Sequence, residues 1–212
     1  GTRDLAGAYD GATARLATAK QRLLAFLAKR GFAYGGTTPA GNPRKYWTYD
    51  FLRWLDKVRP EDDGGVRTLA ALRSEVEAAA EARADLLSEY RAAVDASPIA
   101  AEVAALQSIK GCAFALAAAF SAEVGDFTRF DSPDKLLAYA GMSPSTYQSG
   151  QLKNCYSHME KRGSRYLRYA LYNATKYVCH WDPAFATYLA KKRAEGKHYN
   201  VALPHAARNW FG

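Results

Sequence analysis

Residues 66–94 read VRTLAALRSEVEAAAEARADLLSEYRAAV, a run that contains neither Gly nor Pro. Apolar side chains return there at spacings of three and four residues, which is the repeat of a helix that packs along one seam. The seam positions are Leu69, Leu72, Val76, Ala79, Leu86, Tyr90 and Ala93. Arg83 falls on the same seam and weakens it, because an unpaired charge is costly to bury. The run predicts a long helix that needs a partner for its apolar side.

A similar seam lies nearer the start of the chain and predicts a helix from about Arg3 to Arg30. Its positions are Leu5, Tyr9, Ala12, Leu16, Ala19, Leu23 and Phe26. The two predicted helices fit together most simply as an antiparallel hairpin, a coiled-coil arrangement. Such seams bury either each other or a second copy of the chain, so a homo-oligomer through this region is a hypothesis.

The segment between the two seams predicts the end of this hairpin. Residues 31–42 are rich in Gly, Thr and Pro, which is typical of a loop. Trp47, Phe51, Trp54, Leu55 and Val58 follow and indicate a short amphipathic helix with a bulky aromatic side. Residues 60–65, Pro-Glu-Asp-Asp-Gly-Gly, close that helix.

A domain boundary is expected near residue 97, where Ser97-Pro98 interrupts the helical pattern. We predict a mainly α fold with two parts. Residues 1–97 form a coiled-coil connector, and residues 98–212 form a compact helical domain with a short loop or hairpin around Ser149.

The positive charge is concentrated in the second half of the chain. The net charge of +8 divides into +1 for residues 1–105 and +7 for residues 106–212. This asymmetry favours an anionic partner, with DNA or RNA first among them. The alternative is a basic surface that only aids solubility.

Other features of the sequence point to a protein of a reducing compartment, which we expect to be the cytoplasm. There is no apolar run long enough for a membrane helix and no signal-peptide pattern. The three cysteines are widely spaced and odd in number. A zinc site from Cys155, His158, Cys179 and His180 is the weaker alternative, because adjacent helical residues point about 100° apart. We therefore expect buried cysteines and no metal in this chain.

Residues 109–117, Ile-Lys-Gly-Cys-Ala-Phe-Ala-Leu-Ala, resemble the helix-hairpin-helix pattern. In that pattern a tight glycine turn opens a helix whose free backbone N–H groups hold a DNA phosphate. Lys110, Gly111 and Ala113 are therefore candidate nucleic-acid-binding residues, although Ala113 stands where a second Gly is usual. The alternative is an ordinary glycine turn before a buried helix.

Two later segments carry further candidates. Residues 142–153 are rich in Ser, Thr, Pro and Gly, and Ser149 before Gly150 is either a turn residue or a nucleophile. Lys153 and Lys161 could supply positive charge to a phosphate there. Gly163-Ser164 then predicts a helix start, around which three arginines form a plausible phosphate clamp, with a solvated charged face as the alternative. These arginines are Arg162, Arg165 and Arg168.

Taken together, these segments resemble the C-terminal domain of the DEDD-type insertion-sequence transposases, relatives of the Piv-type DNA invertases. The preceding seams are similar to the coiled-coil connector of that family. The matching residues, in chain order, are Gly111, Glu123-x-Gly125-Asp126, Arg129-Phe130, Leu136, Tyr139-x-Gly141, Pro144, Ser149-Gly150, Lys161-x-Gly163 and Leu167-Arg168.

The resemblance implies a recombinase that cuts and rejoins DNA, directed by a structured guide RNA. It implies that Ser149 is the nucleophile and forms a phosphoserine linkage, while an N-terminal RNase H-like domain binds Mg²⁺ through an Asp-Glu-Asp-Asp set. Nothing in residues 1–105 resembles such a domain, and Gly1-Thr2 is not an initiator pair, so we expect a truncated chain that binds no cofactor and does not recombine DNA alone. The alternative is a non-catalytic helix-hairpin-helix module that binds DNA or RNA.

Overall fold

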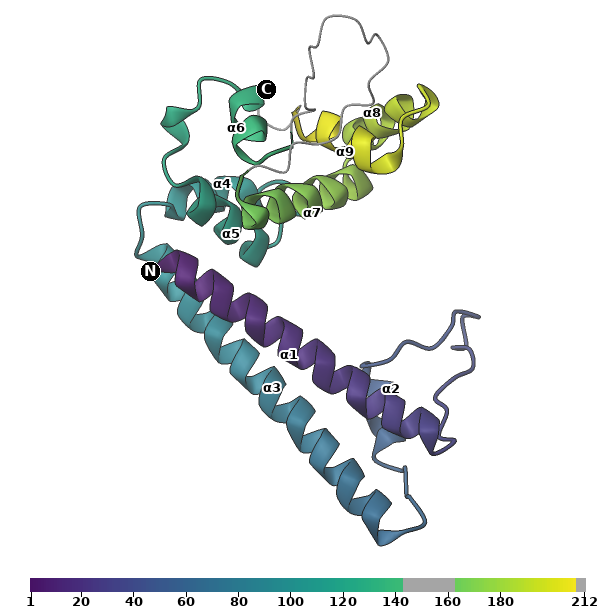
Figure 1. Ribbon diagram of the computed structural model, residues 1–212. Helices are drawn as coiled ribbons and strands as arrows, with labels where there is room; N and C mark the ends of the chain where they lie inside the picture. The colour runs from purple at the N-terminus through teal and green to yellow at the C-terminus, as the bar shows by residue number, and fades with distance from the viewer. Residues whose placement is uncertain (143–162, 209–212) are drawn as a thin grey trace, which may run out of the picture. The chain divides into compact units, whose positions relative to one another are not determined.

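The computed structural model describes residues 1–142 and 163–208, and within these ranges it holds nine α-helices, one 3-10 helix and no strand. The predicted mainly α fold is thus confirmed. Contacts divide the chain into two compact units (Figure 1). We call Gly7–Ser88 the hairpin unit, and Gly1–Ala6 with Glu89–Gly212 the helical unit. None of the helices in the described ranges is both long and apolar enough to cross a membrane.

The hairpin unit is built on α1 (Thr2–Lys29) and α3 (Asp63–Asp95), which run antiparallel. Arg22 forms an ion pair with Glu75 across the two helices at 2.8 Å. Arg83 donates from Nε to the Thr13 hydroxyl at 3.0 Å and from Nη2 to the Tyr9 hydroxyl. The seam therefore accepts Arg83 because two hydroxyl groups of α1 satisfy its guanidinium.

An aromatic cluster closes the end of the hairpin unit around α2 (Tyr49–Leu55). Phe51 is completely buried and its ring centroid lies 5.1–5.6 Å from four other rings. These rings belong to Tyr34, Tyr46, Trp47 and Trp54. The helix is shorter than the aromatic pattern indicated, because Trp47 adopts a φ of 63° and Thr48 caps the helix.

The helical unit comprises the remaining helices. They are α4 (Ala100–Gln107), α5 (Phe114–Val124), the 3-10 helix η1 (Phe127–Arg129), α6 (Pro133–Tyr139), α7 (Arg165–Trp181), α8 (Pro183–Ala194) and α9 (Tyr199–Arg208). Helix α7 is central and packs on α5, α8 and α9. Its predicted inward stripe, Leu167, Leu171, Ala174 and Val178, is at most 1% exposed. Burial of this stripe fixes which side of α7 faces solvent.

The last turns of α3 belong to the helical unit and not to the hairpin unit. Tyr90 is fully buried, and its ring contacts the Phe114 ring at a centroid distance of 5.4 Å. The Arg91 guanidinium lies 4.3 Å from the centre of the Phe114 ring. The compact units therefore divide the chain earlier than residue 97, where the helical pattern breaks, because side-chain packing changes partners before the helix ends.

Candidate nucleic-acid interface

The first candidate element is the turn between α4 and α5. Gly111 adopts a φ of +98°, a left-handed conformation that favours glycine. The Cys112 N–H donates to the Ile109 carbonyl at 3.0 Å and tightens the turn. Helix α5 then begins behind Ala113, whose side chain cannot accept a capping hydrogen bond. Two short helices are thus joined by a glycine turn, whereas the helix-hairpin-helix motif and its binding of phosphate stay predictions.

The same turn packs against the C-terminal end of α7. A Cβ atom on Gly111 would lie 2.9 Å from Cδ1 of Trp181 and 3.1 Å from Tyr177. The exposed Lys110 ammonium lies 5.5 Å from the centre of the Trp181 ring, within range of a cation–π interaction. Glycine is thus required here by the contact with α7, a reason that the sequence pattern did not reveal.

The N-terminal end of α7 is fixed by a second glycine. Gly163 has a φ of +139°, and a Cβ atom there would overlap the Tyr139 carbonyl oxygen and lie 3.1 Å from the Gly141 nitrogen. The end of α6 and the start of α7 therefore touch backbone to backbone. The Arg168 guanidinium strengthens this junction by donating to the carbonyl oxygens of Ala140 at 3.1 Å and Gly163 at 3.4 Å.

Glu123 joins three segments beside this junction. Its carboxylate accepts a hydrogen bond from the Ser164 hydroxyl and forms an ion pair with Arg3 Nε at 3.1 Å. Ser164 also caps α7 by accepting from the Leu167 N–H at 3.1 Å. The Glu123 side chain is only 12% exposed, so water competes little for these contacts. Residue-by-residue interpretation gave Glu123 no role, because its partners are distant in sequence.

The structure separates the predicted binding residues into two groups. Lys110, Gly111 and Ala113 belong to the turn that packs at the C-terminal end of α7, whereas Arg165 and Arg168 lie in its first turn. The two ends of a 17-residue helix are about 24 Å apart. The described candidates therefore do not converge on one phosphate. They lie at the two ends of one helix.

The arginines in the first turn of α7 differ in their freedom. Arg165 is exposed, and its guanidinium lies 5.5 Å from the centre of the Tyr166 ring. Arg168 is half-buried and holds backbone carbonyls. Their phosphate-binding role stays a prediction, and Arg165 is the better placed of the two. The other predicted site residues lie outside the described residues; they are Ser149, Lys153, Lys161 and Arg162.

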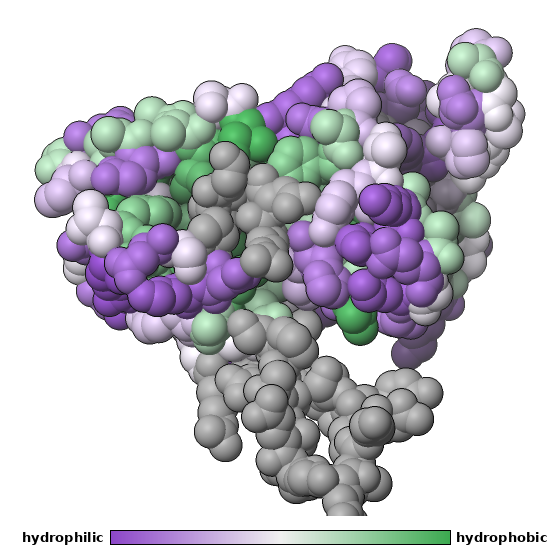
Figure 2. All heavy atoms as spheres, turned by 90° about the horizontal axis from the view of Figure 1, so that it is seen from above, coloured by the Kyte–Doolittle hydropathy of each residue, from purple (hydrophilic) through white to green (hydrophobic). Residues whose placement is uncertain are grey.

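The surface of the molecule seen in Figure 2 is mostly hydrophilic, and hydrophobic residues form only small areas between the polar ones where the spheres are coloured. Exposed aromatic side chains occur on α7, however, at Tyr166, Tyr169, Tyr177 and Trp181. Sequence interpretation missed them. Their signal was present, since aromatic residues recur on one side of the helix, rotated by about 100° from the predicted apolar stripe.

Two cysteines of the helical unit are poor nucleophiles and poor metal ligands. Burial raises the pKa of the Cys112 thiol to about 11 and also raises the pKa of Cys179, so both stay protonated near neutral pH. Across residues 1–142 and 163–208, no group of three His, Cys, Asp or Glu side chains is arranged to hold a metal ion. Cys155 and His158, half of the zinc alternative, lie outside the described residues.

Comparisons with known proteins agree on one class of protein. Residues 103–190 match the model of the transposase IS116/IS110/IS902 family. This segment falls within the helical unit and extends from within α4 to within α8. This segment of the helical unit is therefore similar to that transposase family, in agreement with the class that the resemblance predicted.

Individual relatives point the same way. The chain is 32% identical to y4qE of Sinorhizobium fredii, whose name assigns it to the transposases, over 149 residues that cover 70% of this chain and 33% of the relative. It is 33% identical to the 43.6 kDa protein of insertion element IS110 from Streptomyces coelicolor, over 65% of this chain and 33% of the relative. A 42 kDa protein of insertion element IS900 from Mycobacterium paratuberculosis is 33% identical over 48% of this chain and 25% of the relative. The chain thus spans about a third of the length of the first two relatives.

Proposed function

We propose that this chain is the nucleic-acid-binding C-terminal part of a transposase and that it supplies Ser149 as the nucleophile of DNA strand cleavage and rejoining. The observation that carries the proposal is the transposase-family match over residues 103–190, which includes both α7 and the stretch with Ser149. The excess positive charge of the same half of the chain supports it, since DNA is a polyanion.

The anchor points of the Ser149 stretch also support the proposal. The chain leaves the described helices after the buried Met142 and returns at Gly163, whose backbone touches the end of α6. Arg165 follows two residues later and is exposed. A phosphate bound at this junction would meet a guanidinium group that makes no hydrogen bond to the backbone of residues 1–142 and 163–208.

The proposed strand cleavage needs neither an oxidant nor a co-reactant. The Ser149 Oγ forms a bond to a DNA phosphorus, and the bond between that phosphorus and the deoxyribose oxygen breaks. The leaving oxygen takes up a proton in place of the one that the serine hydroxyl loses. Rejoining reverses the step with a different deoxyribose hydroxyl. Mg²⁺, held by a domain outside this chain, would supply charge stabilisation, and a structured RNA would choose the DNA site.

Binding to nucleic acid is the first testable consequence, and it needs only this chain. We expect the affinity for DNA to fall steeply with salt, because each phosphate contact releases about one counterion. Changing Arg165 to Gln should weaken binding and reduce the slope of log affinity against log salt by about one. Fluorescence anisotropy at several salt concentrations measures both. Asp50→Asn on α2 in the hairpin unit is a matched control that should leave the slope unchanged, and a wild-type chain that binds no polynucleotide at low salt would contradict the proposal.

The covalent step is tested in a longer protein that includes the metal-binding domain. A DNA substrate nicked beside the cleavage site traps the linkage, so we expect a DNA adduct that resists denaturation with the wild type and none with Ser149→Ala. Ser145→Ala, four residues away, should retain the adduct. An adduct that survives Ser149→Ala would exclude this serine as the nucleophile.

The second candidate function is a non-catalytic helix-hairpin-helix module, which the α4–Gly111–α5 geometry favours. It predicts binding that depends on Lys110 and no covalent adduct.

We also propose, from the apolar seams, that the hairpin unit forms homo-oligomers. A mass by light scattering that stays monomeric at all concentrations would contradict this.

A further inference from the structure

The solvent side of α7 is aromatic, which is unusual for an exposed helix face. Four rings project from it with exposed fractions between 47% and 62%. They belong to Tyr166, Tyr169, Tyr177 and Trp181, and we call them the aromatic row. At 3.6 residues per turn they fall within a sector about 120° wide and extend over about 22 Å of the helix. Rings so placed form a line of flat apolar surfaces open to a ligand.

Positive charge flanks the row at both of its ends. Helix α7 contains three Lys or Arg residues and no Asp or Glu. Arg165 lies beside Tyr166 at one end, the exposed Lys176 lies near the other, and Lys110 reaches over the Trp181 ring. The occupant that fits such a surface carries negative charge at intervals and flat apolar groups between the charges. Nucleic acid has this chemistry.

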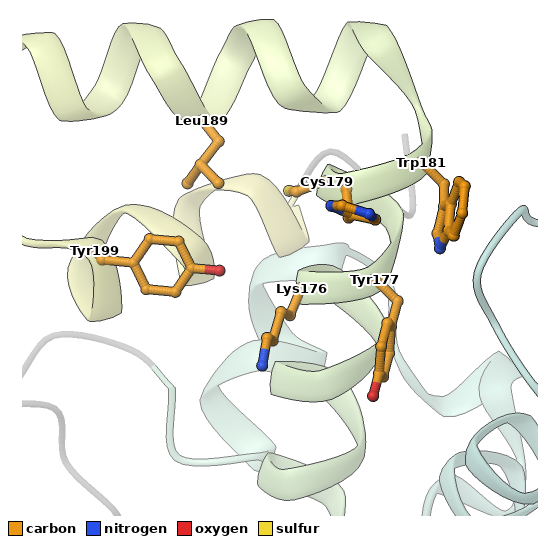
Figure 3. Close-up of a pocket in the computed structure, with 7 residues that line it drawn as sticks. Lys176, Tyr177, Cys179, Trp181, Leu189 and Tyr199 are labelled. Carbon is orange, nitrogen blue, oxygen red and sulfur yellow. The ribbon is translucent and has the colours of Figure 1, made fainter. Parts of the chain in front are cut away.

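The C-terminal end of the row adjoins a cavity of about 510 Å³ between α7, α8 and α9. In Figure 3, Tyr177 and Trp181 project from the same side of α7, and Lys176 lies on the side nearer Tyr199 of α9. Leu189 of α8 and the buried Cys179 give the cavity an apolar lining. A cavity with aromatic and apolar walls and an ammonium group at its edge is suited to a base with its phosphate.

We propose that the aromatic row binds an unpaired segment of nucleic acid, whose bases stack on the four rings while Arg165, Lys176 and Lys110 contact the phosphates. This inference rests on the proposed function, because it specifies which nucleic acid the helical unit takes. Base faces are hidden in a duplex and exposed in a single strand, so a stacking surface selects unpaired nucleotides. The length of the row corresponds to roughly six stacked nucleotides at 3.4 Å each.

The test compares three probes of equal length with the 212-residue chain: a single-stranded oligonucleotide, a duplex, and an abasic strand that keeps the phosphates but lacks the bases. We expect the wild type to prefer the base-bearing single strand. Tyr169→Leu, at the most exposed ring, and Trp181→Leu should each weaken single-strand binding at least about five-fold, the lower end for loss of one stacked base. Neither variant should change affinity for the abasic strand.

Tyr49→Leu is the matched control, since Tyr49 is 75% exposed but lies on α2 in the hairpin unit. Because Trp181 also contacts Gly111, helicity by circular dichroism is compared for each variant, and Tyr169→Leu alone suffices for the test if Trp181→Leu is misfolded. Unchanged single-strand affinity in a folded Tyr169→Leu variant would overturn the stacking surface. If Lys176→Gln still weakened the binding of all three probes, the proposed nucleic-acid binding of the helical unit would stand.

A second copy of the chain is the competing occupant of the row. In that case Tyr169→Leu would lower the oligomeric mass in light scattering without changing the preference for base-bearing strands, and the proposal would be overturned.

Discussion

Gly163→Ala is expected to destabilise the helical unit by about 2–5 kcal/mol, through backbone strain and overpacking. A φ of +139° is a conformation that residues with a Cβ atom rarely adopt. The added methyl group would also overlap the Tyr139 carbonyl oxygen, and the neighbouring atoms of Ala140 and Gly141 are backbone. Backbone cannot move aside as a flexible side chain can, so α6 and α7 would have to separate. Urea denaturation followed by circular dichroism measures the loss.

Gly196→Ala separates the two causes. Gly196 also has a positive φ, of +80°, but an added Cβ atom there would have no neighbour within 4 Å. Gly196→Ala should therefore lower the free energy of unfolding by only about 1 kcal/mol, which is the strain of the left-handed conformation. If the two variants lost the same free energy of unfolding, the contact between the end of α6 and Gly163 would add nothing to the destabilisation. A DNA affinity that falls with Gly163→Ala while the protein stays folded would connect this junction to binding.

Phe51→Ala is expected to destabilise the hairpin unit by about 3–5 kcal/mol. Phe51 is 0% exposed and is the ring shared by all four aromatic contacts in its cluster. Its removal leaves a cavity among these rings and the buried leucines that α1, α2 and α3 contribute to the same cluster, so collapse around it is limited. Trp47 and Trp54 report the loss directly, because thermal unfolding of the hairpin unit changes their fluorescence.

Leu52→Ala is the control, since Leu52 is on the same helix and 47% exposed. Its cost should stay below about 1 kcal/mol. Neither substitution should alter DNA affinity below the unfolding temperature, because the proposed binding residues lie in the helical unit. A large loss of DNA affinity in folded Phe51→Ala would assign the hairpin unit a direct part in binding.

The candidate site was only partly predictable. The glycine turn at Gly111 and the start of α7 at Ser164 follow from local sequence, because turn conformation and capping depend on neighbouring residues. The association of Lys110 with Trp181, and of Glu123 with Arg3 and Ser164, depends on segments that are 41 to 120 residues apart. No local pattern encodes such pairs, since they form only when the helices pack.

The sequence by itself determined the two long helices, the start of α7, the aromatic end of the hairpin unit, the glycine turn and the distribution of charge. Period, capping residues and composition act over a few residues and can be read along the chain. Only the tertiary structure decided that the predicted binding residues lie at two ends of α7 rather than together, and that Arg168 holds backbone carbonyls. It also decided that four rings of α7 remain in solvent, because burial of the apolar stripe against α5 and α9 left the adjoining side of the helix outward.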